Sequence, residues 1–353
     1  MTRTANQARP KAPSPVVQLT VHQVVRETAD AVTLVLNAPT ANTVRYRAGQ
    51  FLTLRVPSAD GPLARCYSLS SSPVADNLPA VTIKRVRDGR ASNWICDNVT
   101  AGMVLDTLPP AGNFVPRDWD APFVLLAAGS GITPVMSILR TALVAHRNPI
   151  TLVYANADRE SVIFDRDLAE LARRHGDRLT VVHLLETEHG LPDATLIASA
   201  IANPAGAHVY ICGPGPFMTV ARAAASSKGI DEAQIHHEVF VSLESDAFEA
   251  RPAESAPSAD GDQVTATVEL DGEEHTIDWP KSTVLLDVLL DKGLDAPYVC
   301  REGTCGGCAY TLLSGEVEML DNQTLDDYDL ARGSRLACQS LPRSEHLAIA
   351  FDI

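Results

Sequence analysis

Four cysteines near the C-terminal end of the chain have the spacing of a metal centre. Cys300, Cys305 and Cys308 form a C-x4-C-x2-C run, and Cys338 follows after twenty-nine further residues. This is the plant-type spacing for a 2Fe-2S cluster, in which two thiolates bind each iron. A structural zinc site is the alternative, but zinc modules usually pair two C-x2-C arms or add histidines, and neither occurs around Cys338. The spacing therefore predicts an iron–sulfur centre held by these four cysteines.

Three glycines within the same run favour a backbone that folds tightly around inorganic sulfide. Gly303, Gly306 and Gly307 lie between the cysteines. Glycine tolerates backbone angles that other residues avoid, so the loop can direct its N–H groups at the sulfur atoms.

A second candidate site lies in a β-rich stretch. The run Arg65-Cys66-Tyr67-Ser68-Leu69 brings together a cation, an aromatic ring and a hydroxyl. On a strand, Arg65 and Tyr67 share one face, where a guanidinium could bind a cofactor phosphate and a phenol ring could pack on a flavin. The alternative is an ordinary pair of surface side chains on a barrel strand.

The stretch Gly89–Trp94 is typical of a turn that enters a short helix. The first N–H groups of such a helix could hold a pyrophosphate. A simple helix N-cap by Ser92 is the alternative.

Two glycine-containing turns each lie between an apolar strand and a helix. The first is Ala128-Gly129-Ser130-Gly131-Ile132-Thr133-Pro134, and the second is Cys212-Gly213-Pro214-Gly215-Pro216. Two such turns at the carboxyl ends of parallel strands indicate a nucleotide-binding crevice. Each turn by itself could be purely structural.

Composition limits the classes of function. The chain has 353 residues, enough for two or three domains, and a net charge of −15, which argues against binding nucleic acid. Cys66, Cys96 and Cys212 are scattered singly, which favours a reducing cytoplasm over a secreted disulfide framework. No apolar run is long enough to span a bilayer. From Val264 onward there are seventeen acidic and six basic residues, so this segment could steer toward a basic partner or could simply be a solvated face.

The chain divides into segments of different pattern. Short β-rich runs up to about residue 118 predict an antiparallel barrel or sandwich. Alternating strands and helices over 119–244 predict a parallel sheet covered on both faces. The stretch 245–262 has the composition of a flexible linker, and 263–353 opens with a predicted hairpin before the cysteine run.

The order Arg65-x-Tyr67-Ser68, then the Gly129–Pro134 turn, then the Cys212-Gly213-Pro214 turn resembles the ferredoxin-NADP reductase family. The attached cysteine run narrows the resemblance to oxygenase reductases with the flavin domain first and the ferredoxin last. The resemblance implies a tail at 1–15, an antiparallel β-barrel FAD domain at 16–118, an α/β NAD domain at 119–244, a linker at 245–262 and an α+β, β-grasp 2Fe-2S domain at 263–353.

The resemblance also implies roles for particular residues. Tyr67, Cys212 and Glu238 would act at the hydride-transfer site, and His236 and His237 beside Glu238 receive no role. Residues implied in binding FAD or the nicotinamide nucleotide are Arg65, Tyr67, Ser68, Leu69, Lys84, Ala91, Ser92, Gly129, Gly131, Thr133, Gly213, Pro214 and Phe240. From the residues alone, Glu238-Val239-Phe240 is better explained as a terminal strand.

Together these features imply an NADH-dependent reductase that passes electrons through FAD and a 2Fe-2S cluster to a Rieske oxygenase. A plant-type cluster lies near about −400 mV and a Rieske centre at roughly −150 mV or higher, so this transfer would be favourable by ~250 mV. Asp158 could repel a 2′-phosphate and Arg159 could attract one, so the preference for NADH rests on the family. The alternatives are a reductase for another oxygenase, such as a di-iron epoxygenase, or a redox-sensing interaction protein.

Overall fold

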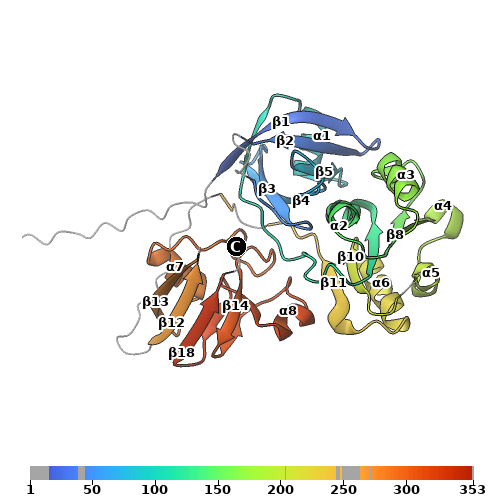
Figure 1. Cartoon of the computed structure of the whole chain (residues 1–353). Helices are drawn as coiled ribbons and strands as arrows, with labels where there is room; N and C mark the ends of the chain where they lie inside the picture. Colours follow the sequence, from blue (N-terminus) through green and yellow to red (C-terminus); the bar gives the residue numbers. More distant parts are fainter. Residues whose placement is uncertain are drawn as a thin grey trace, which may run out of the picture.

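The structure is a computed structural model. The structure describes residues 16–38, 44–202, 204–243, 247–248, 263–270 and 272–351. The expected tail at 1–15 and nearly all of the expected linker at 245–262 lie outside these residues. Figure 1 shows three units: a blue barrel, a green and yellow α/β unit beside it, and an orange and red unit below the barrel.

The first unit is a nearly closed antiparallel barrel, with strand order β4-β3-β6-β1-β2-β5. A bridge between Leu69 and Val81 links the end of β4 to β5. Leu69 is fully buried, as are Leu34, Leu52 and Ile83, because alternate residues of each strand face the barrel interior. The elements are β1 (Val17–Arg26), β2 (Ala31–Asn37), β3 (Phe51–Val56), β4 (Leu63–Ser68), β5 (Ala80–Lys84), α1 (Arg90–Asn98) and β6 (Val104–Thr107).

The prediction of a barrel or sandwich is thus resolved in favour of the barrel. Strand β6 was not predicted from the sequence. It has only four residues, and it is a strand because Val104–Thr107 pairs with β1, in a register that sets Thr107 opposite Val17.

The second unit is a parallel sheet of order β11-β10-β7-β8-β9. Ile132 of α2 and Leu168 of α3 pack in the core on one face, whereas Ile197 of α5 and Phe217 of α6 pack on the other, which confirms the predicted coverage of both faces. The elements are β7 (Phe123–Ala128), η1 (Gly129–Gly131), α2 (Ile132–Ala145), β8 (Ile150–Asn156), α3 (Asp165–Arg174), β9 (Leu179–Leu185), α4 (Glu186–His189), α5 (Ala194–Ala200), β10 (His208–Cys212), α6 (Gly215–Ser227), η2 (Glu232–Gln234) and β11 (Ile235–Glu238).

The third unit is α+β, with a sheet of order β13-β12-β18-β14-β16 and a second pair, β15-β17. Strand β12 runs parallel to β18 and antiparallel to β13, and Trp279 and Leu289 are fully buried in the core between the sheet and α7. This matches the expected β-grasp fold. The elements are β12 (Gln263–Leu270), β13 (Glu273–Pro280), α7 (Leu285–Asp291), β14 (Ala309–Ser314), β15 (Val317–Met319), α8 (Asp327–Ala331), β16 (Ser334–Leu336), β17 (Ser340–Pro342) and β18 (His346–Ala350).

Among the helices that the structure describes, none combines the length and the apolar character needed to cross a bilayer.

Candidate functional site

The four predicted ligand cysteines converge on one point of the third unit. The Cys300 sulfur lies beside those of Cys305 and Cys338, and the Cys338 sulfur also lies beside that of Cys308. All four side chains are buried, and none of the chain's seven cysteines forms a disulfide. The loop after α7 supplies three of the thiols, and the turn between β16 and β17 supplies the fourth.

Backbone N–H groups point at these sulfur atoms. The N–H groups of Glu302 and Gly307 donate to the sulfurs of Cys300 and Cys305, each at 3.3 Å. Gly303 and Gly306 have φ angles of +76° and +67°, a region that favours glycine. Four buried thiols with donors aimed at the sulfurs match what a 2Fe-2S cluster requires of its protein.

The cysteine loop lies against the barrel. A Cβ at Gly306 would meet Asn113 at 3.1 Å, and one at Gly307 would meet Ala111 at 3.2 Å. Cys300 and Cys305 also share an apolar cluster with Phe51 of β3. The predicted cluster site therefore faces the unit that carries the predicted flavin site.

A cavity on the barrel, which we call the flavin cavity after its predicted ligand, brings together most of the predicted flavin-binding side chains. Arg65 and Tyr67 of β4 line it, as predicted from their shared strand face. The guanidinium of Arg65 donates to the Leu243 carbonyl oxygen at 3.2 Å, which ties the segment after β11 to this wall. Other predicted residues that line the cavity are Ser68, Lys84, Ala91, Ser92, Thr133 and Phe240.

Five predicted cofactor-binding residues do not line this cavity: Leu69 and, in the two glycine-containing turns, Gly129, Gly131, Gly213 and Pro214. The alternative role of Ser92 as a helix N-cap is wrong. Leu69 is fully buried in the barrel core and does not line the cavity. Ser92 is not a helix N-cap, because α1 begins after Gly89 and Ser92 lies within the helix. Its hydroxyl instead accepts a hydrogen bond from the Val86 N–H at 3.1 Å and holds the turn before α1.

The two glycine-containing turns touch each other at the carboxyl ends of the adjacent strands β7 and β10. A Cβ at Gly131 would lie 2.1 Å from the Cys212 carbonyl oxygen, so only glycine fits there. The Tyr154 hydroxyl donates to the Gly129 carbonyl oxygen at 2.9 Å and braces the first turn. Pro214, in the second turn, is exposed at the start of α6. Helix N-termini at adjoining strand ends can attract a dinucleotide's phosphates.

Three residues from different elements meet beside these turns. Cys212 ends β10 and pairs in register with Glu238 of β11, and the Ser68 side chain of β4 is hydrogen bonded to Glu238. Burial raises the pKa of Glu238 to about 8, and the Ser68 hydrogen bond offsets only part of this effect. One carboxyl oxygen of Glu238 has no partner among the described residues. Burial also raises the pKa of the Cys212 thiol, which therefore stays protonated.

A second cavity lies where the three units meet. Ser68 and Glu238 line it on the side of the predicted hydride-transfer site, whereas Thr304 and Cys305 line it on the side of the predicted cluster site. Cys66 borders both this cavity and the flavin cavity. Burial raises the pKa of the Cys66 thiol to about 12. It is therefore a neutral side chain between the two predicted redox sites.

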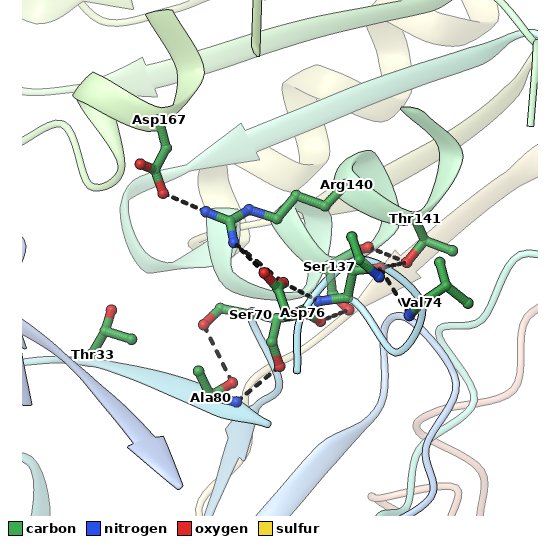
Figure 2. A network of polar contacts seen from close by, with 12 residues as sticks. Thr33, Ser70, Val74, Asp76, Ala80, Ser137, Arg140, Thr141 and Asp167 are labelled. Carbon is green, nitrogen blue, oxygen red and sulfur yellow. Dashed lines mark hydrogen bonds and ion pairs between the residues drawn. The ribbon is translucent and has the colours of Figure 1, made fainter. Parts of the chain in front are cut away.

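A network of polar contacts fixes the α/β unit against the barrel on another side (Figure 2). Arg140 of α2 points at Asp76 of the barrel, with nitrogen–oxygen distances of 3.2 and 3.3 Å, and also at Asp167 of α3. The hydroxyls of Ser72 and Thr141 are 2.8 Å apart across the same boundary. These contacts hold the flavin cavity and the glycine turns in one arrangement.

Several residues of the site were not predicted from the sequence. Thr82, Val86, Ser130, Val241 and Ser242 also line the flavin cavity. Cys66 has no predicted role, although its place within the Arg65–Leu69 run is a usable signal. His236 received no role, yet it hydrogen bonds across a unit boundary, and no local pattern indicates such a contact.

Family models match the three units in the order expected. Residues 17–115 match an oxidoreductase FAD-binding domain, residues 125–223 an oxidoreductase NAD-binding domain, and residues 268–343 a 2Fe-2S iron-sulfur cluster binding domain. These matches support the expected cofactors, FAD, NAD(H) and a 2Fe-2S cluster.

Known proteins resemble the chain over nearly its whole length. It is 53% identical to the 3-ketosteroid-9-alpha-monooxygenase, ferredoxin reductase component, of Mycolicibacterium smegmatis, over 96% of this chain and 98% of the relative. Identity to the protein of the same name from Rhodococcus rhodochrous is 48%, over 95% and 97%. A component of the 1,2-phenylacetyl-CoA epoxidase of Escherichia coli is 32% identical, over 95% and 97%.

A solved structure aligns with nearly the whole chain. Phthalate dioxygenase reductase, described as a modular structure for electron transfer from pyridine nucleotides to [2Fe-2S], aligns with a TM-score of 0.57 and 25% identity. The alignment covers 95% of this chain and 98% of that one.

Proposed function

The chain belongs to the family of the ferredoxin reductase components of 3-ketosteroid-9-alpha-monooxygenase, and on that basis we propose that it supplies electrons from NADH to a steroid-hydroxylating oxygenase. The observation that carries the proposal is spatial. The cavity at the junction of the three units has Ser68 and Glu238 on one side and Cys305 on the other. In this proposal the site for hydride transfer and the site for the iron–sulfur cluster share this cavity.

A flavin accepts the two electrons of a hydride and releases them singly, which matches a nicotinamide donor to a one-electron cluster. In this proposal Arg65, Lys84 and Ser92 bind the FAD phosphates, and Tyr67 packs on the flavin ring. Lys84 also pairs with Asp30 at 3.6 Å, which keeps its ammonium group at the cavity wall.

The residues between the two nucleotide sites position groups and exclude water. Gly131 and Gly213 let the two turns pack closely beside the proposed nicotinamide site, and Cys212 packs there as a neutral thiol. Glu238, with a pKa of about 8, is mostly protonated at neutral pH and can donate a hydrogen bond from its carboxyl O–H. Phe240 is half exposed at the cavity wall, where its ring can cover the flavin.

NADH is the proposed donor. Arg159, the cation best placed to attract a 2′-phosphate, is ion paired with Asp165 at 2.6 Å. Asp158 beside it accepts a hydrogen bond from the Ser161 N–H at 2.8 Å. The pair leaves little net positive charge at this turn, which favours the cofactor without the extra phosphate.

The proposed acceptor is an oxygenase with a Rieske centre, and the proposed compartment is the cytoplasm. A reconstitution experiment tests the client. Purified chain, NADH and a 3-ketosteroid oxygenase component are expected to yield hydroxylated steroid at a rate that depends on this chain. The proposal fails if steroid hydroxylation is no better than with buffer while a phenylacetyl-CoA epoxidase or another oxygenase is supported well.

A further inference from the structure

The start of α8 in the cluster-bearing unit makes a compact set of contacts with the other two units. We name its residues Asp326, Tyr328 and Asp329 the α8 latch. Their partners are His236 of β11 and two residues of the segment between β6 and β7, Asn113 and Arg117. All six side chains line the cavity at the junction of the three units.

On the side of the α/β unit, a chain of hydrogen bonds reaches the latch through two histidines. His236 Nδ1 lies 2.8 Å from Asp326 Oδ2, and His236 Nε2 lies 3.0 Å from His208 Nδ1. Burial alone would raise the pKa of Asp326, but hydrogen bonds from His236 and from the Asp329 N–H outweigh it and lower the pKa. The ionised carboxylate accepts, so His236 Nδ1 donates.

Aromatic contacts fix the orientation of this chain. The imidazole of His236 stacks on His208 at 5.3 Å and on Tyr210 at 4.9 Å between ring centres. Tyr328 meets the imidazoles of His236 and His208 edge-on, at 5.1 and 5.9 Å. The latch therefore combines a charged hydrogen bond with packed rings, and such contacts restrict rotation as well as separation.

On the side of the barrel, Asp329 receives two contacts. Asn113 Nδ2 donates to one carboxyl oxygen at 2.9 Å, and Arg117 Nη2 lies 3.4 Å from the other. The Asp329 side chain is only 8% exposed, so a carboxylate left without these partners would destabilise the folded protein. Asn113 is also the residue against which Gly306 of the cysteine loop packs.

We propose that the α8 latch positions the cysteine loop against the barrel for electron transfer between the flavin site and the cluster site. The inference rests on the proposed function and adds positioning residues to it. The latch and the loop share the 111–117 segment, so a displaced latch tilts the loop away from Phe51 and Cys66. Asp326, Asp329 and His236 line the same junction cavity, and they act on transfer through the placement of the loop.

The test compares the Asp326→Asn/Asp329→Asn double variant with Asp327→Asn in the full-length holoprotein. Asparagine caps a helix as well as aspartate does, so α8 is retained while both latch charges are removed. Asp327 is an exposed carboxylate on the same helix and provides the matched control. His236→Ala removes the contact from the α/β side without altering the cluster-bearing unit.

In the double variant and in His236→Ala, NADH-driven bleaching of the cluster in stopped flow is expected to slow about tenfold or more. Ferricyanide reduction by NADH and cluster reduction by dithionite stay within about twofold of wild type. Small-angle scattering is expected to show a larger radius of gyration for both variants and an unchanged one for Asp327→Asn.

The inference fails if the bleaching rate and the radius of gyration of both latch variants equal those of wild type. It also fails if cluster bleaching slows equally in Asp327→Asn. A wild-type protein whose cluster is not reduced by NADH refutes the proposed function instead. The scattering comparison needs no electron transfer, so it decides the latch in that case as well.

Discussion

Replacement of Glu238 by glutamine tests the hydride-transfer site. Burial raises the pKa of this carboxyl from 4.5 to about 8, which corresponds to a penalty of about 5 kcal/mol against the ionised form. About one side chain in ten is then ionised at pH 7, and about nine in ten at pH 9. Glutamine has nearly the shape of the protonated acid and also donates a hydrogen bond, but it cannot ionise.

If the protonated form supports hydride transfer, the wild-type rate falls about tenfold between pH 7 and pH 9. The Glu238→Gln rate stays nearly level and matches wild type at pH 6. The stability of the fold also falls as pH rises, because the pKa of Glu238 is higher in the folded than in the unfolded state. The contribution of this carboxyl to the free energy of unfolding is complete below about pH 4.5 and is lost as pH rises through about 8.

The assay is stopped-flow reduction of the bound flavin by NADH, followed from pH 6 to pH 9.5 with saturating NADH. Glu232→Gln is the control, because Glu232 pairs with Arg222 outside the cavities. A wild-type inflection near pH 8 that persists in Glu238→Gln would show that another group titrates. Slow reduction at every pH in Glu238→Gln would show that the carboxyl transfers its proton during flavin reduction, which contradicts a purely hydrogen-bonding role.

Two further substitutions test other parts of the site. Cys305→Ser should abolish the 2Fe-2S absorbance while ferricyanide reduction by NADH is retained, and Cys96→Ser should change neither; equal loss of both signals in Cys305→Ser would show that the units do not work separately. Gly131→Ala places a Cβ 2.1 Å from the Cys212 carbonyl oxygen and should destabilise this unit by about 1–3 kcal/mol and raise KM for NADH. Gly176→Ala lies outside both turns, and its Cβ would meet only the Ala172 carbonyl oxygen, at 3.2 Å. It should leave KM unchanged, and an equal rise in KM there would contradict the steric explanation.

Features that depend on neighbours in the chain could be predicted from the sequence. The spacing of Cys300, Cys305 and Cys308 constrains a single loop, and a loop of that length can surround only certain centres. The glycine turns after β7 and β10 follow from strand, glycine and helix patterns in short windows. Residues Arg65 and Tyr67 share a face because a strand has a period of two.

Contacts between distant segments had no signal in the local pattern. Strand β6 exists through its pairing with β1. The juxtaposition of Ser68 and Glu238 and the contact of His236 with Asp326 depend on how whole units pack. The reason is physical: periodicity and turn chemistry constrain backbone within a few residues, whereas burial and hydrogen bonding between units depend on the packed tertiary arrangement.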